Sequence, residues 1–326
     1  MNNNSETLEA AIDKAFALDV DNGLSAFPKT LPSKYFYDEK GDKIFQEIMG
    51  MEEYYLTRAE YELFENEKAD ILNQILSDEG AFRLLELGAG DGYKTRVLLD
   101  HFVGANANFS YAPVDISGHV LDILREKISG EFPQLDIQCM PGDYFEALSR
   151  LDHNTGIRNV VLFLGSNIGN FNQEQAIVFL SQLRKYLDPD DMLLIGVDLR
   201  KKPETILNAY NDASGITKRF NINLLDRINR ELDGNIDVSL FDHYPIYNPS
   251  TGECKSYLIN REKQTFRLEA LDKEYVLDDW EPIFTEVSKK FSKKEIAELA
   301  EKSGFEIVHN YYDSKGLFCD SLWKAL

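Results

Sequence analysis

Between residues 83 and 198 the sequence alternates between short apolar runs and amphipathic stretches of helical length. The apolar runs are RLLEL, SYAPVDI, LDIQCMPGDY, NVVLFL and DMLLIGVDL, and helical patterns such as YKTRVLLDHF and QEQAIVFLSQLRKYL separate them. Strands that alternate with helices predict a parallel sheet that is covered by helices on both faces. We therefore expect an α/β fold.

The alternation stops between about 200 and 285, where polar helix-like pieces precede strand patterns over 237–248, 252–268 and 273–278. It resumes in a helix with Ser292 as N-cap, followed by two apolar strands that the turn DSKG joins into an antiparallel hairpin. We expect three parts: an N-terminal helical segment over 1–75, a sheet domain over 76–200 and 286–326, and an inserted α+β domain over 201–285.

The chain carries a net charge of −21. Binding to nucleic acid needs a cationic surface, so we expect no nucleic-acid partner. No apolar run reaches the length of a membrane-spanning helix, and the polar N-terminus does not resemble a signal peptide. Three widely spaced cysteines and scattered histidines predict free thiols and no metal site. We expect a cytoplasmic monomer that acts on a small molecule.

A glycine loop follows the first strand in LLELGAGDGYKT, and Gly88, Gly90 and Gly92 occupy alternate positions in it. Glycine there permits positive φ and close approach of the backbone to a ligand. A dinucleotide-binding loop has the spacing GxGxxG, which requires a third glycine at position 93, and this chain has Tyr93. A tight strand-to-helix turn also needs glycine, so this loop alone does not identify a ligand.

Acidic residues lie at or near the ends of three successive strands: Glu86, Asp115 and Asp143. A carboxylate after the second strand can accept both hydroxyls of a ribose, and ligands bind at this edge of open α/β sheets. Each aspartate alone is equally consistent with a helix N-cap or a turn. As an ordered set they resemble the class I S-adenosylmethionine-dependent methyltransferases, whose cofactor has no pyrophosphate. The resemblance implies a Rossmann-like seven-stranded sheet with an antiparallel C-terminal hairpin.

A closer resemblance covers residue 28 to the C-terminus. The segments KYFYDEKGDKIF, EYYLTRAE, ELGAGDGYKTRVLL, FLGSNIGNF, AYNDASGITKRFNINLL and TEVSKKF occur in the order found in the histidine N-alpha-methyltransferase family. That family makes the trimethylated histidine used for ergothioneine. The resemblance implies S-adenosylmethionine as cofactor and an inserted domain that binds the substrate.

The resemblance also implies roles for individual residues. Those assigned to the cofactor are Glu86, Gly88, Gly90, Gly92, Lys94, Asp115, Asp143 and Tyr144. Those assigned to the amino acid are Tyr37, Tyr54, Asn170, Tyr210, Ser256, Glu286 and Ser288. Tyr37 and Asn170 are the catalytic candidates. Asn170 would hold the amino and carboxylate end of the substrate, Tyr210 its carboxylate, and Glu286 and Ser288 the imidazole.

These roles have simpler alternatives. Tyr37 and Tyr54 could be core tyrosines with a surface hydroxyl. Asn170 could cap the following helix, and Lys94 could be an ordinary surface lysine. Glu286 and Ser288 alternate on a predicted strand and would share one side, which could face solvent.

The proposed reaction is in-line displacement, in which a neutral amine attacks the methyl carbon and S-adenosylhomocysteine leaves. No sequence feature identifies a general base. Three residues depart from the family pattern: Ser256 stands where methionine is expected, Leu56 where proline is expected, and Asn167 where threonine is expected. A sister enzyme for another aromatic amino acid, such as tryptophan or tyrosine, therefore stays open. A non-catalytic protein that binds S-adenosylmethionine is the alternative from a different functional class.

Overall fold

The computed structural model describes residues 3–76, 80–150 and 156–326. These residues form two compact units. We call Leu56–Lys201 with Lys289–Leu326 the sheet unit, and Met1–Tyr55 with Lys202–Ser288 the mixed unit. This division differs from the three parts expected from the sequence, because residues 1–55 group with the inserted region and the helix over 56–75 groups with the sheet.

The sheet unit contains one large sheet with the strand order β13-β14-β7-β6-β2-β3-β4, and β5 also pairs with β3. Its strands are β2 (Phe82–Leu87), β3 (Phe109–Asp115), β4 (Asp136–Ile137), β5 (Met140–Pro141), β6 (Arg158–Phe163), β7 (Met192–Asp198), β13 (Phe305–Tyr312) and β14 (Phe318–Ala325). The strands from β4 to β7 are parallel, and β14 is antiparallel to both β7 and β13. The expected seven-position sheet with an antiparallel C-terminal hairpin is confirmed.

The prediction of one continuous third strand in LDIQCMPGDY is wrong. This segment forms two short strands, β4 and β5, which Gln138 and Cys139 separate. Tyr111 of β3 accepts the Gln138 backbone N–H at 2.8 Å, so its carbonyl points toward this edge. Pro113 lies two residues further along β3 and points the same way, but proline has no N–H to donate. The ladder therefore breaks opposite Pro113.

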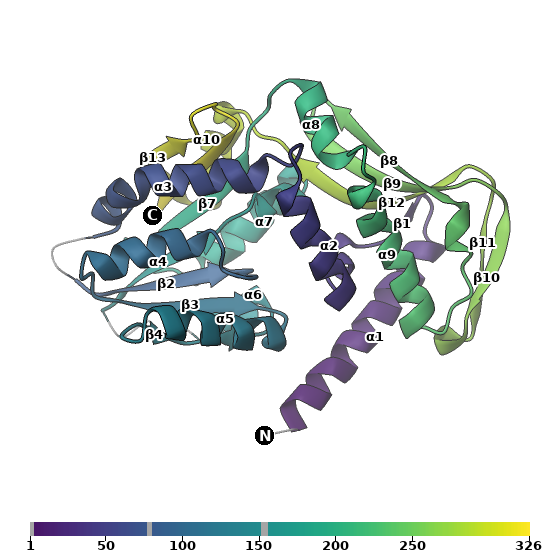
Figure 1. Cartoon of the computed structure of the whole chain (residues 1–326), viewed down its shortest axis with the longest axis horizontal. Helices are drawn as coiled ribbons and strands as arrows, with labels where there is room; N and C mark the ends of the chain where they lie inside the picture. Colours follow the sequence, from purple (N-terminus) through teal and green to yellow (C-terminus); the bar gives the residue numbers. More distant parts are fainter. Residues whose placement is uncertain (1–2, 77–79, 151–155) are drawn as a thin grey trace. The chain divides into compact units, whose positions relative to one another are not determined.

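Helices cover both faces of this sheet (Figure 1). They are α3 (Leu56–Ile75), α4 (Thr95–Gly104), α5 (Gly118–Glu131), α6 (Tyr144–Ser149), α7 (Gln173–Arg184) and α10 (Lys293–Ser303). Successive strand residues point to opposite faces. Leu84 accordingly packs in a core with residues of α3, α4 and α5, whereas Leu85 packs in a second core with residues of α6, α7 and α10.

The mixed unit combines helices with a small sheet of order β1-β12-β9-β8 and a separate pair, β10-β11. Its helices are α1 (Asn3–Ser25), α2 (Glu39–Gly50), α8 (Pro203–Tyr210) and α9 (Ile216–Glu231). Its strands are β1 (Lys29–Thr30), β8 (Phe241–Asn248), β9 (Glu253–Asn260), β10 (Gln264–Leu268), β11 (Lys273–Leu277) and β12 (Glu281–Lys289). Its core joins side chains of α1, α2 and α9 to the strands, Phe220 and Leu258 among them.

The strand expected over 252–268 is also broken, into β9 and β10. Asn260 ends β9, and its amide donates to the carbonyl oxygens of Glu262 at 2.6 Å and Asp278 at 2.9 Å. These bonds hold the chain in a turn where the sequence pattern alone suggested continuous pairing.

The two segments that leave and re-enter the sheet unit run side by side within it. Phe291 donates its N–H to the Asp198 carbonyl at 2.8 Å, and the Arg200 N–H donates to the Phe291 carbonyl at 2.9 Å. The fully buried Asp198 carboxylate pairs with Lys201 and, at 2.8 Å, with the fully buried Lys290. Burial alone would raise the pKa of Asp198, but the two ammonium charges hold it below its usual value.

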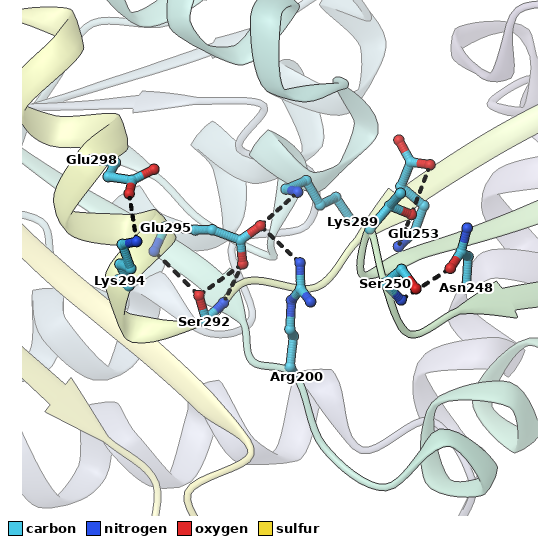
Figure 2. Close-up of polar contacts among 10 residues, drawn as sticks. Arg200, Asn248, Ser250, Glu253, Lys289, Ser292, Lys294, Glu295 and Glu298 are labelled. Atoms are coloured by element: carbon cyan, nitrogen blue, oxygen red, sulfur yellow. Dashed lines mark hydrogen bonds and ion pairs between the residues drawn. The ribbon is translucent and has the colours of Figure 1, made fainter.

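A second charged cluster surrounds Glu295 in the first turn of α10. The Glu295 carboxylate contacts Lys289 at 2.9 Å and Arg200 at 2.8 Å, and it lies beside Ser292 (Figure 2). Ser292 caps the helix, since its hydroxyl accepts the Glu295 N–H and Glu295 accepts the Ser292 N–H. Burial raises the pKa of Glu295, but bonds from Ser292 and Lys289 outweigh this and lower it to about 2.

In the described part of the chain, none of the helices combines the length and the apolar character that crossing a membrane requires. The three cysteines are free thiols.

The capping box at Ser292 gives a first prediction. Ser292→Ala removes the side-chain acceptor for the Glu295 N–H and should lower the free energy of unfolding by about 1 kcal/mol. Urea denaturation measures the change. Ser129→Ala, at an exposed position inside α5, is the matched control and should leave stability nearly unchanged. Equal effects of the two substitutions would contradict the capping role.

Candidate active site

The glycine loop lies between β2 and α4, and Gly88, Gly90 and Gly92 have φ values of 76°, 52° and 64°. A Cβ on Gly88 would lie 2.9 Å from the Tyr144 hydroxyl oxygen and 3.5 Å from the Asn167 amide nitrogen. Gly88 is therefore required both by its backbone conformation and by the approach of the Tyr144 hydroxyl. A Cβ on Gly90 would meet nothing within 4 Å, so the loop is open at that point.

The two acids after β3 and β5 have different local roles. Asp115 is half-buried and accepts the Gly90 N–H at 3.2 Å and the Ser117 N–H at 3.0 Å, which ties it to the glycine loop. Asp143 is exposed and accepts the Phe145 N–H at 2.9 Å, so its alternative interpretation as a helix N-cap is confirmed. Capping uses one carboxylate oxygen of Asp143 and does not exclude a ligand contact by the other.

Glu86 lies beneath the loop, buried in the sheet unit. One of its oxygens accepts the Thr95 hydroxyl and the other accepts the Tyr111 hydroxyl. Burial is the main reason that the pKa of Glu86 rises to about 7, and the two hydrogen bonds limit the rise. Glu86 thus links β2 to β3 and to α4, and its contact with a cofactor stays a prediction.

Lys94 and Asn170 flank the same edge of the sheet. Lys94 is half-buried just before α4 and forms an ion pair with the buried Glu60 of α3, so it is not an ordinary surface lysine. Asn170 is exposed at the end of the short 3₁₀ helix Asn167–Asn170. It does not cap the next helix, because the side chain of Asn172 accepts the Gln175 N–H and forms the capping box of α7.

The tyrosines assigned to the amino acid lie together in the mixed unit. The Tyr210 hydroxyl donates to the Ser288 hydroxyl oxygen at 2.8 Å. The Tyr54 ring lies 6.4 Å from the Tyr210 ring and 6.3 Å from the Phe45 ring, and Phe45 also contacts Tyr37 at 5.4 Å. Tyr37 is 45% exposed, so it is not a core tyrosine. An aromatic series thus leads from the exposed Tyr37 to the buried Tyr210–Ser288 pair.

Glu286 and Ser288 both lie on β12, which confirms the predicted strand. Ser288 is buried and does not face solvent, whereas Glu286 is half-buried. Ser256 is buried on β9 in the same alternating series as Leu258, which belongs to the core of the mixed unit. Its carbonyl oxygen accepts the Thr285 hydroxyl at 3.1 Å, and this bond connects it to β12 next to Glu286.

The sequence analysis missed Glu60. Its carboxylate is buried and also accepts the Gly165 N–H at 2.7 Å, directly before residues 166–170, which we call the SNIGN segment. The signal was present, because Glu60 interrupts the apolar stripe of α3 formed by Leu56, Ala59, Leu63 and Phe64. A charged residue in such a stripe needs a buried partner.

Comparison with known proteins identifies the family of this chain. The family model described as histidine-specific methyltransferase, S-adenosylmethionine-dependent, matches residues 16–325. The histidine N-alpha-methyltransferase of Mycolicibacterium smegmatis is 39% identical over 95% of this chain and 94% of its own length. Ergothioneine biosynthesis protein 1 of Schizosaccharomyces pombe is 29% identical over 86% of this chain, which corresponds to 37% of that protein. Among solved structures, a mitomycin 7-O-methyltransferase aligns with a TM-score of 0.47 at 16% identity, over 90% of this chain and 59% of its own.

The order of strands and the glycine loop define a Rossmann-like methyltransferase sheet. The chain belongs to the histidine-specific, S-adenosylmethionine-dependent methyltransferase family. It is accordingly an S-adenosylmethionine-dependent enzyme. The sheet unit fits that cofactor, because the loop is open at Gly90 and the Asp115 carboxylate stands beside it at the end of β3.

The buried Glu86 gives a prediction about pH. The pKa of Glu86 is higher in the folded chain, about 7, than the usual 4.5, so its contribution to stability is full below pH 4.5 and is lost as the pH rises toward 7. Glu86→Gln should remove a pH-dependent loss of up to about 3 kcal/mol. Denaturation at several pH values tests this, with the exposed Glu126→Gln as control. Parallel pH profiles for Glu86→Gln and the unaltered chain would contradict it.

Proposed function

We propose that this enzyme methylates the α-amino group of free L-histidine and forms trimethylhistidine. The observation that carries the proposal is the family match over residues 16–325, together with 39% identity to a histidine N-alpha-methyltransferase along nearly the whole chain. The similarity to an ergothioneine biosynthesis protein supports a role in making that compound.

We propose that the mixed unit recognises the amino acid. A carboxylate that accepts an imidazole N–H makes a charge-assisted hydrogen bond, and Glu286 is the half-buried carboxylate on β12 that supplies it. Tyr210 and Ser288 already share a hydrogen bond, and hydroxyl hydrogens rotate. We propose that these two hydroxyls act as one unit, with Ser288 toward the imidazole and Tyr210 toward the carboxylate of the substrate. Tyr54 and Tyr37 contribute the aromatic walls and their hydroxyls.

We propose that residues of the sheet unit hold the cofactor. Asp115 would accept the ribose hydroxyls, Asp143 and Tyr144 would meet the adenine, and Gly88 and Lys94 would contact the rest of the molecule. When bound, S-adenosylmethionine supplies a methyl group that is activated by its sulfonium. The chain's contribution is to orient the amine, and alignment of bound reactants contributes up to roughly 7–11 kcal/mol to lowering a barrier.

The amine must be neutral to react. Desolvation of the amine and a nearby positive charge both lower the pKa of an amine. We propose that Asn170 holds the amino and carboxylate end of the substrate through its neutral amide, which tolerates the ammonium, the neutral amine and the methylated intermediates alike. The Tyr37 hydroxyl oxygen can accept a hydrogen bond from an N–H group of the amine.

We further propose that the enzyme acts as a cytoplasmic monomer and has no nucleic-acid partner. The net charge of −21 supports the last point, since it opposes association with a polyanion.

The substrate can be tested directly. The purified chain, S-adenosylmethionine and an equimolar mixture of the standard amino acids are incubated together, and methylated products are identified by mass spectrometry. We expect trimethylhistidine alone. A different methylated amino acid would overturn the histidine assignment and direct attention to Ser256, which replaces the methionine expected in the family. Absence of every methylated product, with S-adenosylhomocysteine still bound, would point to a modified amino acid instead.

Side-chain recognition gives a separate prediction. Glu286→Gln replaces a charged acceptor by a neutral one of the same shape and should lower kcat/KM for histidine roughly tenfold to a hundredfold, as expected for loss of a charge-assisted hydrogen bond. Affinity for S-adenosylhomocysteine, measured by calorimetry, should not change. Glu274→Gln, at an exposed position on β11, is the matched control. An unchanged kcat/KM in Glu286→Gln would remove Glu286 from the recognition of the imidazole.

A further inference from the structure

The side chain of Glu60 is 1% exposed, although it carries a carboxylate, and it lies on the face of α3 that packs on the sheet. Its two oxygens have different partners. One accepts the Gly165 N–H at 2.7 Å, and the other pairs with the Lys94 ammonium. Glu60 therefore joins the loop after β6 to the residue that follows the glycine loop after β2.

The bond to Gly165 fixes the turn that begins the SNIGN segment. In a trans peptide the N–H and the preceding carbonyl point in opposite directions. With the Gly165 N–H directed at Glu60, the Leu164 carbonyl points the other way and accepts the Asn167 N–H at 3.3 Å. This turn leads directly into the short 3₁₀ helix that ends at Asn170.

Two glycines make room for this arrangement. A Cβ on Gly196 of β7 would lie 2.3 Å from the Glu60 oxygen that binds Gly165, and 3.1 Å from the Gly165 nitrogen. A Cβ on Gly165, which has a φ of 72°, would lie 3.3 Å from the Lys94 ammonium. Glycine in the middle of a strand weakens the strand, so its presence at Gly196 marks a site where another group approaches closely.

Asp320 completes the cluster from β14, where it pairs in register with Gly196. It is fully buried, and neither of its oxygens meets a hydrogen-bond donor among the residues that the structure describes. Burial and then the negative charge of Glu60 raise the pKa of Asp320 well above its usual value. Asp320 thus favours its neutral acid form, which adds no second negative charge beside Glu60 and leaves Lys94 with a single carboxylate partner.

We propose that Glu60 is a positioning residue for methyl transfer: its carboxylate holds the Lys94 ammonium and the Gly165–Asn170 turn in their working arrangement. The inference rests on the proposed function, in which Lys94 contacts the cofactor and Asn170 the substrate. Glu60 itself touches neither ligand and acts through these two groups.

The substitution Glu60→Gln distinguishes the contact of Glu60 with Gly165 from its contact with Lys94. The glutamine carbonyl still accepts the Gly165 N–H, whereas its NH₂ group faces Lys94, where it cannot act as a partner for the ammonium. We expect at least a tenfold weaker affinity for S-adenosylhomocysteine and a tenfold lower kcat/KM for S-adenosylmethionine, with a thermal midpoint close to that of the unaltered chain. Glu65→Gln is the matched control, since Glu65 is an outer residue of the same helix paired with Lys68. The affinity of Glu65→Gln for S-adenosylhomocysteine and its kcat/KM for S-adenosylmethionine should stay within twofold of the values for the unaltered chain.

A double-mutant cycle distinguishes positioning from a general effect on folding. Lys94→Gln keeps a donor for Glu60 and removes the charge. If Glu60 acts through Lys94, Glu60→Gln should change kcat/KM for S-adenosylmethionine less than twofold in the Lys94→Gln background. Full additivity of the two substitutions would overturn the proposal, as would Glu60→Gln constants equal to those of Glu65→Gln. If Glu60→Gln does not fold, the Lys94→Gln variant tests the proposal instead. An affinity of Lys94→Gln for S-adenosylhomocysteine equal to that of the unaltered chain would then overturn the proposal.

Failure of the proposed function is recognised separately. Binding of S-adenosylhomocysteine to the unaltered chain is measured first and does not depend on which amino acid is methylated. Absence of that binding would contradict the cofactor assignment. Normal binding by the unaltered chain and by Glu60→Gln would contradict the inference about Glu60 alone.

Discussion

One buried carboxylate in the sheet unit holds together the two segments through which the insertion leaves and returns. Asp198 ends β7 at the point where the chain leaves the sheet unit, and its charge is balanced by Lys201 on the outgoing segment and Lys290 on the returning one. Removing the Asp198 carboxylate would leave two ammonium groups in the interior without this counter-charge, which is strongly destabilising. Because both lysines meet one acid, the large insertion between them starts and ends at fixed points of the sheet unit, whatever the insertion itself contains.

Buried carboxylates recur along the same edge of the sheet. Glu86 binds two hydroxyl groups and Glu60 binds an ammonium and a backbone amide. A carboxylate away from water needs such partners, and the energetic demand for them makes each a rigid junction between elements. These contacts of buried carboxylates therefore hold the loops that carry Gly88, Lys94 and Gly165 in place before a ligand binds.

Much of the fold could be read from the sequence, because strand and helix periods differ and Ser292 and the glycine loop mark element ends. The break opposite Pro113 was missed, since only the register shows which neighbour that proline fails to reach. For the site, the ordered motifs gave the residues, and Tyr54, Tyr210 and Ser288 do lie together. Glu60 was overlooked because its partners, Lys94 and Gly165, lie 34 and 105 positions further along the chain, and sequence spacing carries no information about such contacts.

The position of β14 has a consequence for the way the chain is made. This strand lies between β7 and β13 and is antiparallel to both, although it is formed by residues 318–325. On the ribosome, β7 emerges more than a hundred residues earlier. At synthesis rates of roughly 5–20 residues per second, one edge of β7 waits for several seconds with unpaired backbone groups. The nascent protein is therefore most exposed to edge-to-edge aggregation while the insertion is being translated, and chaperone binding during that interval would protect it.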